Sequence, residues 1–411
     1  MEYKISIIIP VYNAADFVAD AFESLRAQTL GFDALQILFV DDCSTDSSKD
    51  ILTAWADEFS NVAVYSTPKN SGGAAGPRNV GLLYADAPYV MFLDNDDYYE
   101  PDACETLYCE AVQSDADLVS GYFRDVTFEK EHVNEKTPAC PLTGKHIFVL
   151  PQQLLAAQDA NVIFWCKIYK NALITEHNLR FYEDTQMEDT VFFTSYLLHC
   201  KSMIYLDKLV YNFRARASVS RTLNAHYLTK HIRGYAYLYT LYHESGHMDC
   251  FDYNVRVVPD YFIPCFFTSE KIEPDEQRDL LQKWQWLVQY TEENALFPSD
   301  EIKAPLLAMT ARGELDAAVA YGRLCAKYDT VGTMNHNNTL QLAALGARNK
   351  AQTSIYLALE KDYERTRSDL FRLNQELLSA QQTIAEIKAS RSYRIGSALL
   401  SPLHALHHRL F

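Results

Sequence analysis

Short, mainly apolar runs separated by amphipathic stretches mark the first hundred residues of the chain. The runs at residues 5–10, 35–40, 62–66 and 89–93 contain single polar residues at Ser6, Gln36 and Ser66 but do not alternate between apolar and polar positions, which is typical of strands buried on both faces. Residues 14–28 and 45–59 have the apolar spacing of helices, with Asn13 and Ser44 as expected N-caps. This alternation predicts βαβ units and a mainly parallel sheet.

Polar residues follow three of these predicted strands at the point where each strand ends. Tyr12 and Asn13 follow the first strand, Asp41 and Asp42 the second, and the sequence Asp-Asn-Asp-Asp at 94–97 the fourth. Ligands of parallel sheets bind beyond the carboxyl ends of the strands. We therefore expect these loops to meet at one edge of the sheet and to form a binding site there.

The aspartates at 94–97 are close enough to repel one another, so the sequence predicts something that compensates their charge. A divalent cation, Mn²⁺ or Mg²⁺, suits one or two of these carboxylates together with substrate phosphate oxygens. The alternative is an acidic turn that caps the helix expected after Pro101. Asp42 can accept hydrogen bonds from a nucleobase or a ribose, or it can form an Asx-type turn into the next helix.

A glycine-rich segment at residues 70–81 opens a further helix and carries Arg78, which can neutralise a phosphate or an aspartate. The segment has neither the GxGxxG pattern of dinucleotide-binding dehydrogenases nor the GK[ST] ending of a P-loop. A formal net charge of -17, without basic clusters interleaved with aromatic residues, argues against nucleic-acid binding.

The cysteine pattern and the chain's hydropathy bear on its location. Nine cysteines without CxxC pairs indicate neither a disulfide framework nor a structural zinc site. The sequence shows no basic leader and no apolar run of about 20 residues. We expect a cytoplasmic protein, either free or peripheral at the inner face of the plasma membrane.

Changes in pattern divide the chain into four segments. Residues 1–223 form the expected catalytic domain, and residues 224–348 a helical domain without a chemical motif. Residues 349–389 keep the 3,4 apolar spacing of a coiled coil through which the chain self-associates, or form one long helix. Residues 390–411 lack acidic side chains and carry leucines at helical spacing, which predicts a basic amphipathic tail that contacts anionic lipid or packs on the coiled coil.

Four motifs in order resemble the family 2 glycosyltransferases of the GT-A fold. They are IIIPVYN at 7–13, VDDCSTD at 40–46, the 70–81 segment ending in RNVG, and LDNDD at 93–97. The resemblance extends more weakly to about residue 220 through WCKIY at 165–169, LRF at 179–181, the Glu188-Asp189 pair and YNFR at 211–214. It implies an inverting transfer from a nucleotide diphosphate donor, UDP in the first place, to a hydroxyl of a glycan or lipid-linked acceptor in surface-glycan assembly.

The resemblance also implies roles for individual residues. The nucleotide would be held by Pro10, Tyr12, Asn13 and Asp42, with Arg78 closing the base pocket. Asp96 would bind the metal directly, Asp94 would contact the ribose or a metal-bound water, and Asp97 would orient them. The family normally has glycine at the position of Cys43, so we expect a local difference in that turn.

The Glu188-Asp189 pair matches the family's acidic pair, in which the aspartate is the general base. An acceptor hydroxyl must lose its proton as it attacks the anomeric carbon, and a carboxylate can take that proton; the alternative is a helix cap. Lys167, Arg214 and Arg216 are weaker candidates for binding the diphosphate or an anionic acceptor, and His226 for a third metal ligand. Each of these four also fits a structural role.

Two other functions compete with transfer of a sugar. A sugar-nucleotide nucleotidyltransferase would need a glycine-rich basic loop directly after the first strand, where this chain has Pro-Val-Tyr-Asn at 10–13. A coiled-coil scaffold with an inactive transferase domain would not need Asp94, Asp96 and Asp189, all of which are present.

Overall fold

The computed structural model describes residues 2–129, 132–136, 142–160, 163–214, 223–256, 258, 262–269, 271–296, 303–323 and 326. The chain divides into two compact units, of which the first ends at Val255 and the second begins at Arg256. The segment limits expected from the sequence stay predictions. The helices that follow the expected limit at residue 223, up to Val255, group with the first unit.

Four parallel strands form the N-terminal half of the sheet in the first unit, in the order β3-β2-β1-β4. Their bounds are Ile5–Val11 (β1), Leu35–Asp41 (β2), Val62–Ser66 (β3) and Tyr89–Phe92 (β4). All positions of β1, β2 and β4 are buried, because helices cover both faces of the sheet. The predicted strands and their parallel arrangement are confirmed.

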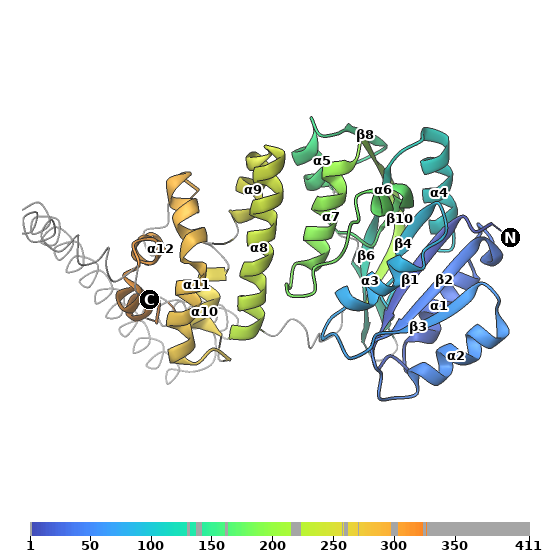
Figure 1. Cartoon of the computed structure of the whole chain (residues 1–411), viewed down its shortest axis with the longest axis horizontal. Coiled ribbons are helices and arrows are strands. Elements are labelled where there is room, and N and C mark those ends of the chain that lie inside the picture. The colour runs from blue at the N-terminus through green and yellow to red at the C-terminus, as the bar shows by residue number, and fades with distance from the viewer. Residues whose placement is uncertain are drawn as a thin grey trace, which may run out of the picture. The chain divides into compact units, whose positions relative to one another are not determined.

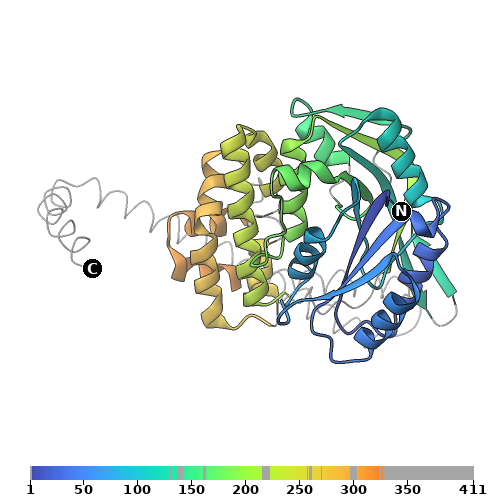
Figure 2. The ribbon, with the colours of Figure 1, turned by 45° about the vertical axis from the view of Figure 1, so that its right-hand side comes forward.

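Helices pack on both faces of these strands (Figure 2). On one face, Phe22 of α1 (Val18–Arg26) stacks on Trp55 of α2 (Ser48–Glu58) and contacts Phe39 of β2. On the other face lies α3 (Ala75–Leu83), where a Cβ atom at Gly81 would come within 2.4 Å of Ile8 Cγ2. Glycine at 81 therefore allows α3 to approach β1.

Both helices α1 and α2 begin later than the sequence predicts, and the predicted N-caps are wrong. The structure has Phe17 and Ser47 at the N-cap positions. Asn13 and Ser44 instead bond across two loops, because the Asn13 N–H donates to Ser44 Oγ at 3.0 Å and the Thr45 N–H to Asn13 Oδ1 at 2.7 Å. Their polar atoms join the ends of β1 and β2.

The second half of the sheet is mixed. Strand β9 (Lys167–Lys170) is antiparallel to β4, and the long strands β6 (Leu118–Glu129) and β10 (Ser202–Arg214) run parallel to each other beyond it. Short strands complete the sheet, namely β5 (Tyr98–Tyr99), β7 (His132–Lys136) and β8 (His146–Val149). The accompanying helices are η1 (Phe32–Ala34), α4 (Ala103–Ser114), α5 (Leu154–Ala160), α6 (Asn171–Glu176), α7 (Glu188–His199), α8 (Ala225–Ser245) and α9 (Met248–Val255).

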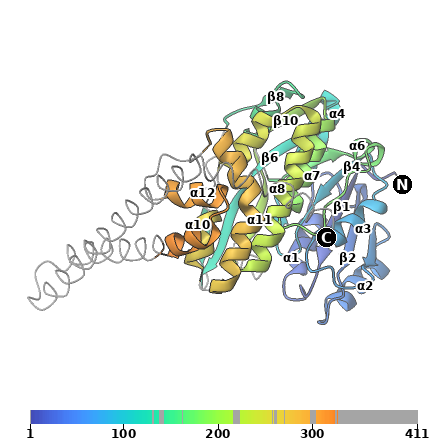
Figure 3. The ribbon, with the colours of Figure 1, turned by 60° about the vertical axis from the view of Figure 1, so that its left-hand side comes forward.

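The described part of the second unit is helical, as the sequence predicts for this region. It contains α10 (Ile263–Thr268), α11 (Pro274–Glu293) and α12 (Lys303–Ala311), and α10 and α12 both pack on α11 (Figures 1 and 3). Trp284 of α11 is fully buried against the rings of Phe262 and Phe266. A capping box of Glu273 and Glu276 begins α11.

The coiled coil predicted at 349–389 and the tail predicted at 390–411 lie outside the described residues. Within the described part of the chain, no helix combines the length and the apolar character needed to cross a membrane.

Candidate active site

The loops after β1, β2 and β4 meet at the carboxyl edge of the sheet, as predicted. The ends are aligned because Val11 pairs with Asp41 and Ile8 with Phe92. Asn95 fastens two of the loops, since its Nδ2 donates to the Pro10 carbonyl at 2.8 Å. The residues expected to bind a nucleotide and a metal therefore lie along one edge.

Asp42 ties the end of β2 to the glycine-rich segment. Its carboxylate accepts hydrogen bonds from the Ser71 N–H (3.0 Å), Ser71 Oγ (2.8 Å) and Thr67 Oγ1 (2.6 Å), and the residue is 3% exposed. Asn70 Nδ2 donates to the Asp42 carbonyl at 3.0 Å. Asp42 thus shapes the loop, and its contact with a nucleotide stays a prediction.

Two residues of these loops have left-handed backbone conformations. Asn13 has φ 49° and Cys43 has φ 61°, a region that glycine adopts most readily. The turn at Cys43 therefore keeps the conformation that a glycine would favour. Beside it, Tyr12 is 49% exposed, which leaves its ring accessible to a ligand at this edge.

Asp97 anchors the acidic turn after β4 from within the protein. It is 1% exposed, and its carboxylate accepts hydrogen bonds from Tyr211 Oη and from the Arg214 N–H, both at 2.7 Å. Tyr211 Oη also accepts the Asp94 N–H at 3.2 Å. Burial, together with the nearby carboxylates of Asp94 and Asp96, raises the pKa of Asp97 well above its usual range.

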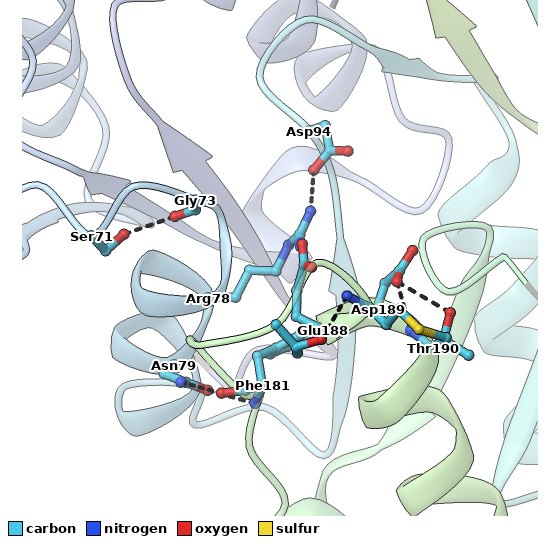
Figure 4. Close-up of polar contacts among 11 residues, drawn as sticks. Ser71, Gly73, Arg78, Asn79, Asp94, Phe181, Glu188, Asp189 and Thr190 are labelled. Atoms are coloured by element: carbon cyan, nitrogen blue, oxygen red, sulfur yellow. Dashed lines mark hydrogen bonds and ion pairs between the residues drawn. The ribbon is translucent and has the colours of Figure 1, made fainter. Parts of the chain in front are cut away.

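Arg78 links the acidic turn to the predicted catalytic pair. From α3 its guanidinium points toward Asp94 (Figure 4), with Nη2 at 2.8 Å from Asp94 Oδ1 and Nη1 at 3.5 Å from Glu188 Oε1. The side chain is 5% exposed, and its guanidinium lies 4.4 Å from the ring centre of Phe164 and 5.4 Å from that of Phe181. Burial disfavours the charged form, but Asp94 and Glu188 outweigh it and raise the pKa of Arg78.

Glu188 and Asp189 occupy the first turn of α7, where the helix dipole favours negative charge. Burial and the adjacent Asp189 raise the pKa of Glu188, while Arg78 opposes that shift. Asp189 Oδ1 accepts the N–H of Thr190 at 2.7 Å (Figure 4). Arg78 therefore links the turn that carries Asp94 to the first turn of α7, which carries the predicted base Asp189.

Asn79 and the rings around Arg78 were not predicted as parts of the site. The Asn79 side chain forms two 2.8 Å bonds with the backbone of Phe181, one to its N–H and one to its carbonyl (Figure 4). These bonds hold α3 against the segment that leads into α7. No local pattern indicates them, because the partners are 102 residues apart.

The residues predicted with less support to bind a phosphate, an acceptor or a metal lie in different parts of the first unit. Lys167 is fully buried, with Nζ donating to Ser120 Oγ at 3.1 Å and lying 4.9 Å from the ring centre of Phe193. Burial lowers its pKa to about 8. Arg214 Nη2 lies 2.7 Å from Asp20 Oδ2. His226 is exposed in the first turn of α8, and Arg216 lies outside the described residues.

Comparisons with known proteins agree with this architecture. Residues 6–176 match the model of glycosyl transferase family 2, the family that the motifs resemble. A crystal structure of Staphylococcus aureus TarS residues 1–349 superposes with a TM-score of 0.62 at 22% identity, covering 80% of this chain and 92% of that one. This similarity shows the GT-A fold.

Among curated proteins, the chain is 32% identical over 205 residues to a poly(ribitol-phosphate) beta-glucosyltransferase of Bacillus spizizenii, a match that covers 49% of this chain and 30% of that protein. It is 29% identical over 222 residues to the uncharacterized glycosyltransferase YibD of Escherichia coli, covering 53% and 63% of the two chains. The matches thus span less than two thirds of the length of these relatives.

Proposed function

We propose that this chain transfers a sugar from a UDP-linked donor to a hydroxyl of a surface glycan or its lipid-linked precursor, with inversion at the anomeric carbon. The observation that carries the proposal is the position of Arg78, which is within 2.8 Å of Asp94 and 3.5 Å of Glu188. A site for transfer needs donor-binding and proton-accepting groups close together, and the proposal is supported by the contact of Arg78 with Glu188, the residue next to the proposed base Asp189.

The donor would lie along the carboxyl edge of the sheet, against Pro10, Tyr12, Asn13 and the loop held by Asp42. Nη1 of Arg78 lies 3.5 Å from Glu188, and Nε has no hydrogen-bond acceptor among the described residues. The positive charge of Arg78 beside this edge would attract the phosphates of the donor. UDP is proposed because a TarS structure contains UDP and another contains UDP-GlcNAc. The names of the relatives favour a poly(ribitol-phosphate) or similar glycan acceptor.

The acidic turn fits a divalent cation. Among the described residues there is no group of three or more His, Cys, Asp or Glu side chains arranged to hold a metal. Mg²⁺ and Mn²⁺ sites, however, often take one or two carboxylates and complete their ligands with phosphate oxygens and water. Burial raises the pKa of Asp97, and the neighbouring carboxylates of Asp94 and Asp96 raise it further; a cation would relieve the part that comes from these carboxylates. Asp96 and Asp94 would hold it, and it would stabilise the charge that develops on the leaving diphosphate.

Asp189 would accept the proton of the acceptor hydroxyl as that hydroxyl attacks the anomeric carbon. The bond from the sugar to the diphosphate breaks as the new glycosidic bond forms, and attack opposite the leaving group inverts the configuration. Glu188, held beside Arg78, would fix the first turn of α7 and thereby orient Asp189. No general acid is needed, because the diphosphate is a weak base.

Two parts of the proposal depend on the sequence alone. Self-association through residues 349–389 predicts an oligomer by light scattering, and a monomer at micromolar concentration would contradict it. Membrane contact by residues 390–411 predicts that the full protein floats with anionic liposomes while a truncation at Ala389 does not. Equal flotation of both proteins would contradict it.

The proposal is tested with the full-length protein and a panel of UDP-sugars, by measuring UDP release with Mn²⁺ or Mg²⁺ and with a chelator. We expect one or a few donors to give metal-dependent release that an acceptor glycan increases. Absence of release from every donor, with and without acceptor, would contradict the proposal.

A further inference from the structure

The helix α8 presents one stripe of residues to the segment that leads into the catalytic pair. Residues 230, 233, 234 and 237 follow the i, i+3, i+4, i+7 spacing that places them on one face of a helix. The opposite segment, residues 182–187, directly precedes Glu188. Helices α7 and α8 lie side by side (Figures 1 and 3).

Each end of this stripe bonds to the segment. Tyr237 Oη donates to Asp184 Oδ1 at 2.9 Å, and its ring centre lies 4.1 Å from that of Tyr182. At the other end, Thr185 Oγ1 donates to the Lys230 carbonyl at 3.2 Å and accepts the N–H of Met187 at 3.0 Å. The segment is therefore fastened to α8 on both sides of Gly234.

Gly234 sits at the closest approach. A Cβ atom there would lie 2.6 Å from Met187 Cβ and 2.7 Å from Thr185 Oγ1. Neither of these atoms is the free end of a long side chain, so an added methyl group must displace the backbone of the segment or of α8. Gly234 does not have a left-handed backbone conformation, so the need for glycine is set by contact and not by φ.

We propose that Gly234 is a positioning residue for Glu188 and Asp189. Met187 carries the link, because its carbonyl accepts the Val191 N–H at 2.9 Å and so belongs to the first turn of α7. A shift of Met187 is transmitted to the two carboxylates that follow it. The inference rests on the proposed function for its effect on transfer, but the packing itself can be measured separately. A misplacement of about 1 Å at a catalytic group can cost about 100-fold in rate.

The test compares three variants of the full-length protein. Gly234→Ala adds the clashing methyl group, and Tyr237→Phe removes the bond to Asp184 with little change in shape. Gly246→Ala is the matched control, because Gly246 ends the same helix at φ 78° with no atom within 4 Å of an added Cβ. It strains the end of α8 without touching the segment.

We expect Gly234→Ala to lower kcat by about 10- to 100-fold with less than about a twofold change in the donor KM, and Tyr237→Phe to lower kcat by a smaller factor. Gly246→Ala should keep kcat per folded molecule even though it lowers the unfolding temperature. Unchanged kcat in Gly234→Ala, or an equal loss in Gly246→Ala, would overturn the inference.

Amide hydrogen exchange gives a readout that does not need transfer. Exchange at the Val191 amide should be faster in Gly234→Ala than in the wild type and in Gly246→Ala, because the Met187–Val191 bond is disturbed. If the wild type shows no transfer while this change is seen, the proposed function fails and the positioning role stands. If exchange in Gly234→Ala equals that of Gly246→Ala, the positioning role fails.

Discussion

Replacing Arg78 by methionine removes the charge that joins the two halves of the site while keeping most of the side-chain length. The change deletes a charge-assisted hydrogen bond to Asp94 at 2.8 Å and a longer ion pair to Glu188 at 3.5 Å. It also deletes the contact of the guanidinium with the Phe164 ring at 4.4 Å. The carboxylates of Asp94 and Glu188 then lose the positive charge that both of them contact.

The expected loss of stability in Arg78→Met depends on how deeply the ion pairs are buried. Breaking a buried ion pair typically costs about 3–5 kcal/mol. The Asp94 and Glu188 side chains keep 26% and 22% exposure, so water compensates part of the loss. We expect Arg78→Met to lower the free energy of unfolding by about 2–3 kcal/mol, which corresponds to about 4–12 °C in unfolding temperature for a unit of this size.

Thermal unfolding of Arg78→Met is compared with that of Arg26→Met. Arg26 forms an equally short contact with Glu23, at 2.7 Å, but the two side chains are 45% and 62% exposed, and such surface pairs contribute about 0.3–0.5 kcal/mol. A double-mutant cycle of Arg78→Met with Asp94→Asn should give a coupling energy of about 1–2 kcal/mol. Equal losses of stability in the two arginine variants, or zero coupling energy between Arg78 and Asp94, would show that the buried ion pair does not stabilise the fold.

Three further outcomes are expected. Asp96→Asn should abolish metal-dependent transfer with little change in unfolding temperature, and full turnover at saturating Mn²⁺ would remove Asp96 from the metal site. Asp189→Asn should retain donor binding by calorimetry while transfer falls by about 100-fold or more; an equal loss of both would make Asp189 structural. Burial lowers the pKa of Lys167 to about 8, so the unfolded chain binds the extra proton between about pH 8 and its ordinary value near 10.5. Relative to Lys167→Met, the wild type should therefore gain stability as the pH rises across that window, and parallel pH dependence of the two proteins would contradict this.

The sequence predicted the N-terminal strands and the meeting of three loops, because those features depend on local apolar runs and on the common direction of parallel strands. It misplaced the starts of α1 and α2, because Asn13 and Ser44 bond to each other's loops across the sheet edge. Local capping rules do not include partners about 31 residues away.

Local sequence patterns did not predict most contacts between segments that are far apart in the chain. Arg78 was expected to neutralise a phosphate or an aspartate and to close a base pocket; the structure identifies the aspartate as Asp94 and adds an ion pair with Glu188. The closeness of Gly234 to Met187 arises from the packing of two helices. The only local feature of the sequence that points to this close contact is a glycine within a helical pattern. These features follow from tertiary packing and not from periodicity.

The stereochemistry of transfer, followed by proton NMR with the preferred UDP-sugar and a hydroxyl acceptor, distinguishes direct attack assisted by Asp189 from other routes. The account predicts that the wild type converts an α-linked donor into a β-linked product, and that Asp189→Asn binds the donor but forms this product at least about 100-fold more slowly. An α-linked product, or a β-linked product formed equally fast by both proteins, would contradict direct attack assisted by Asp189.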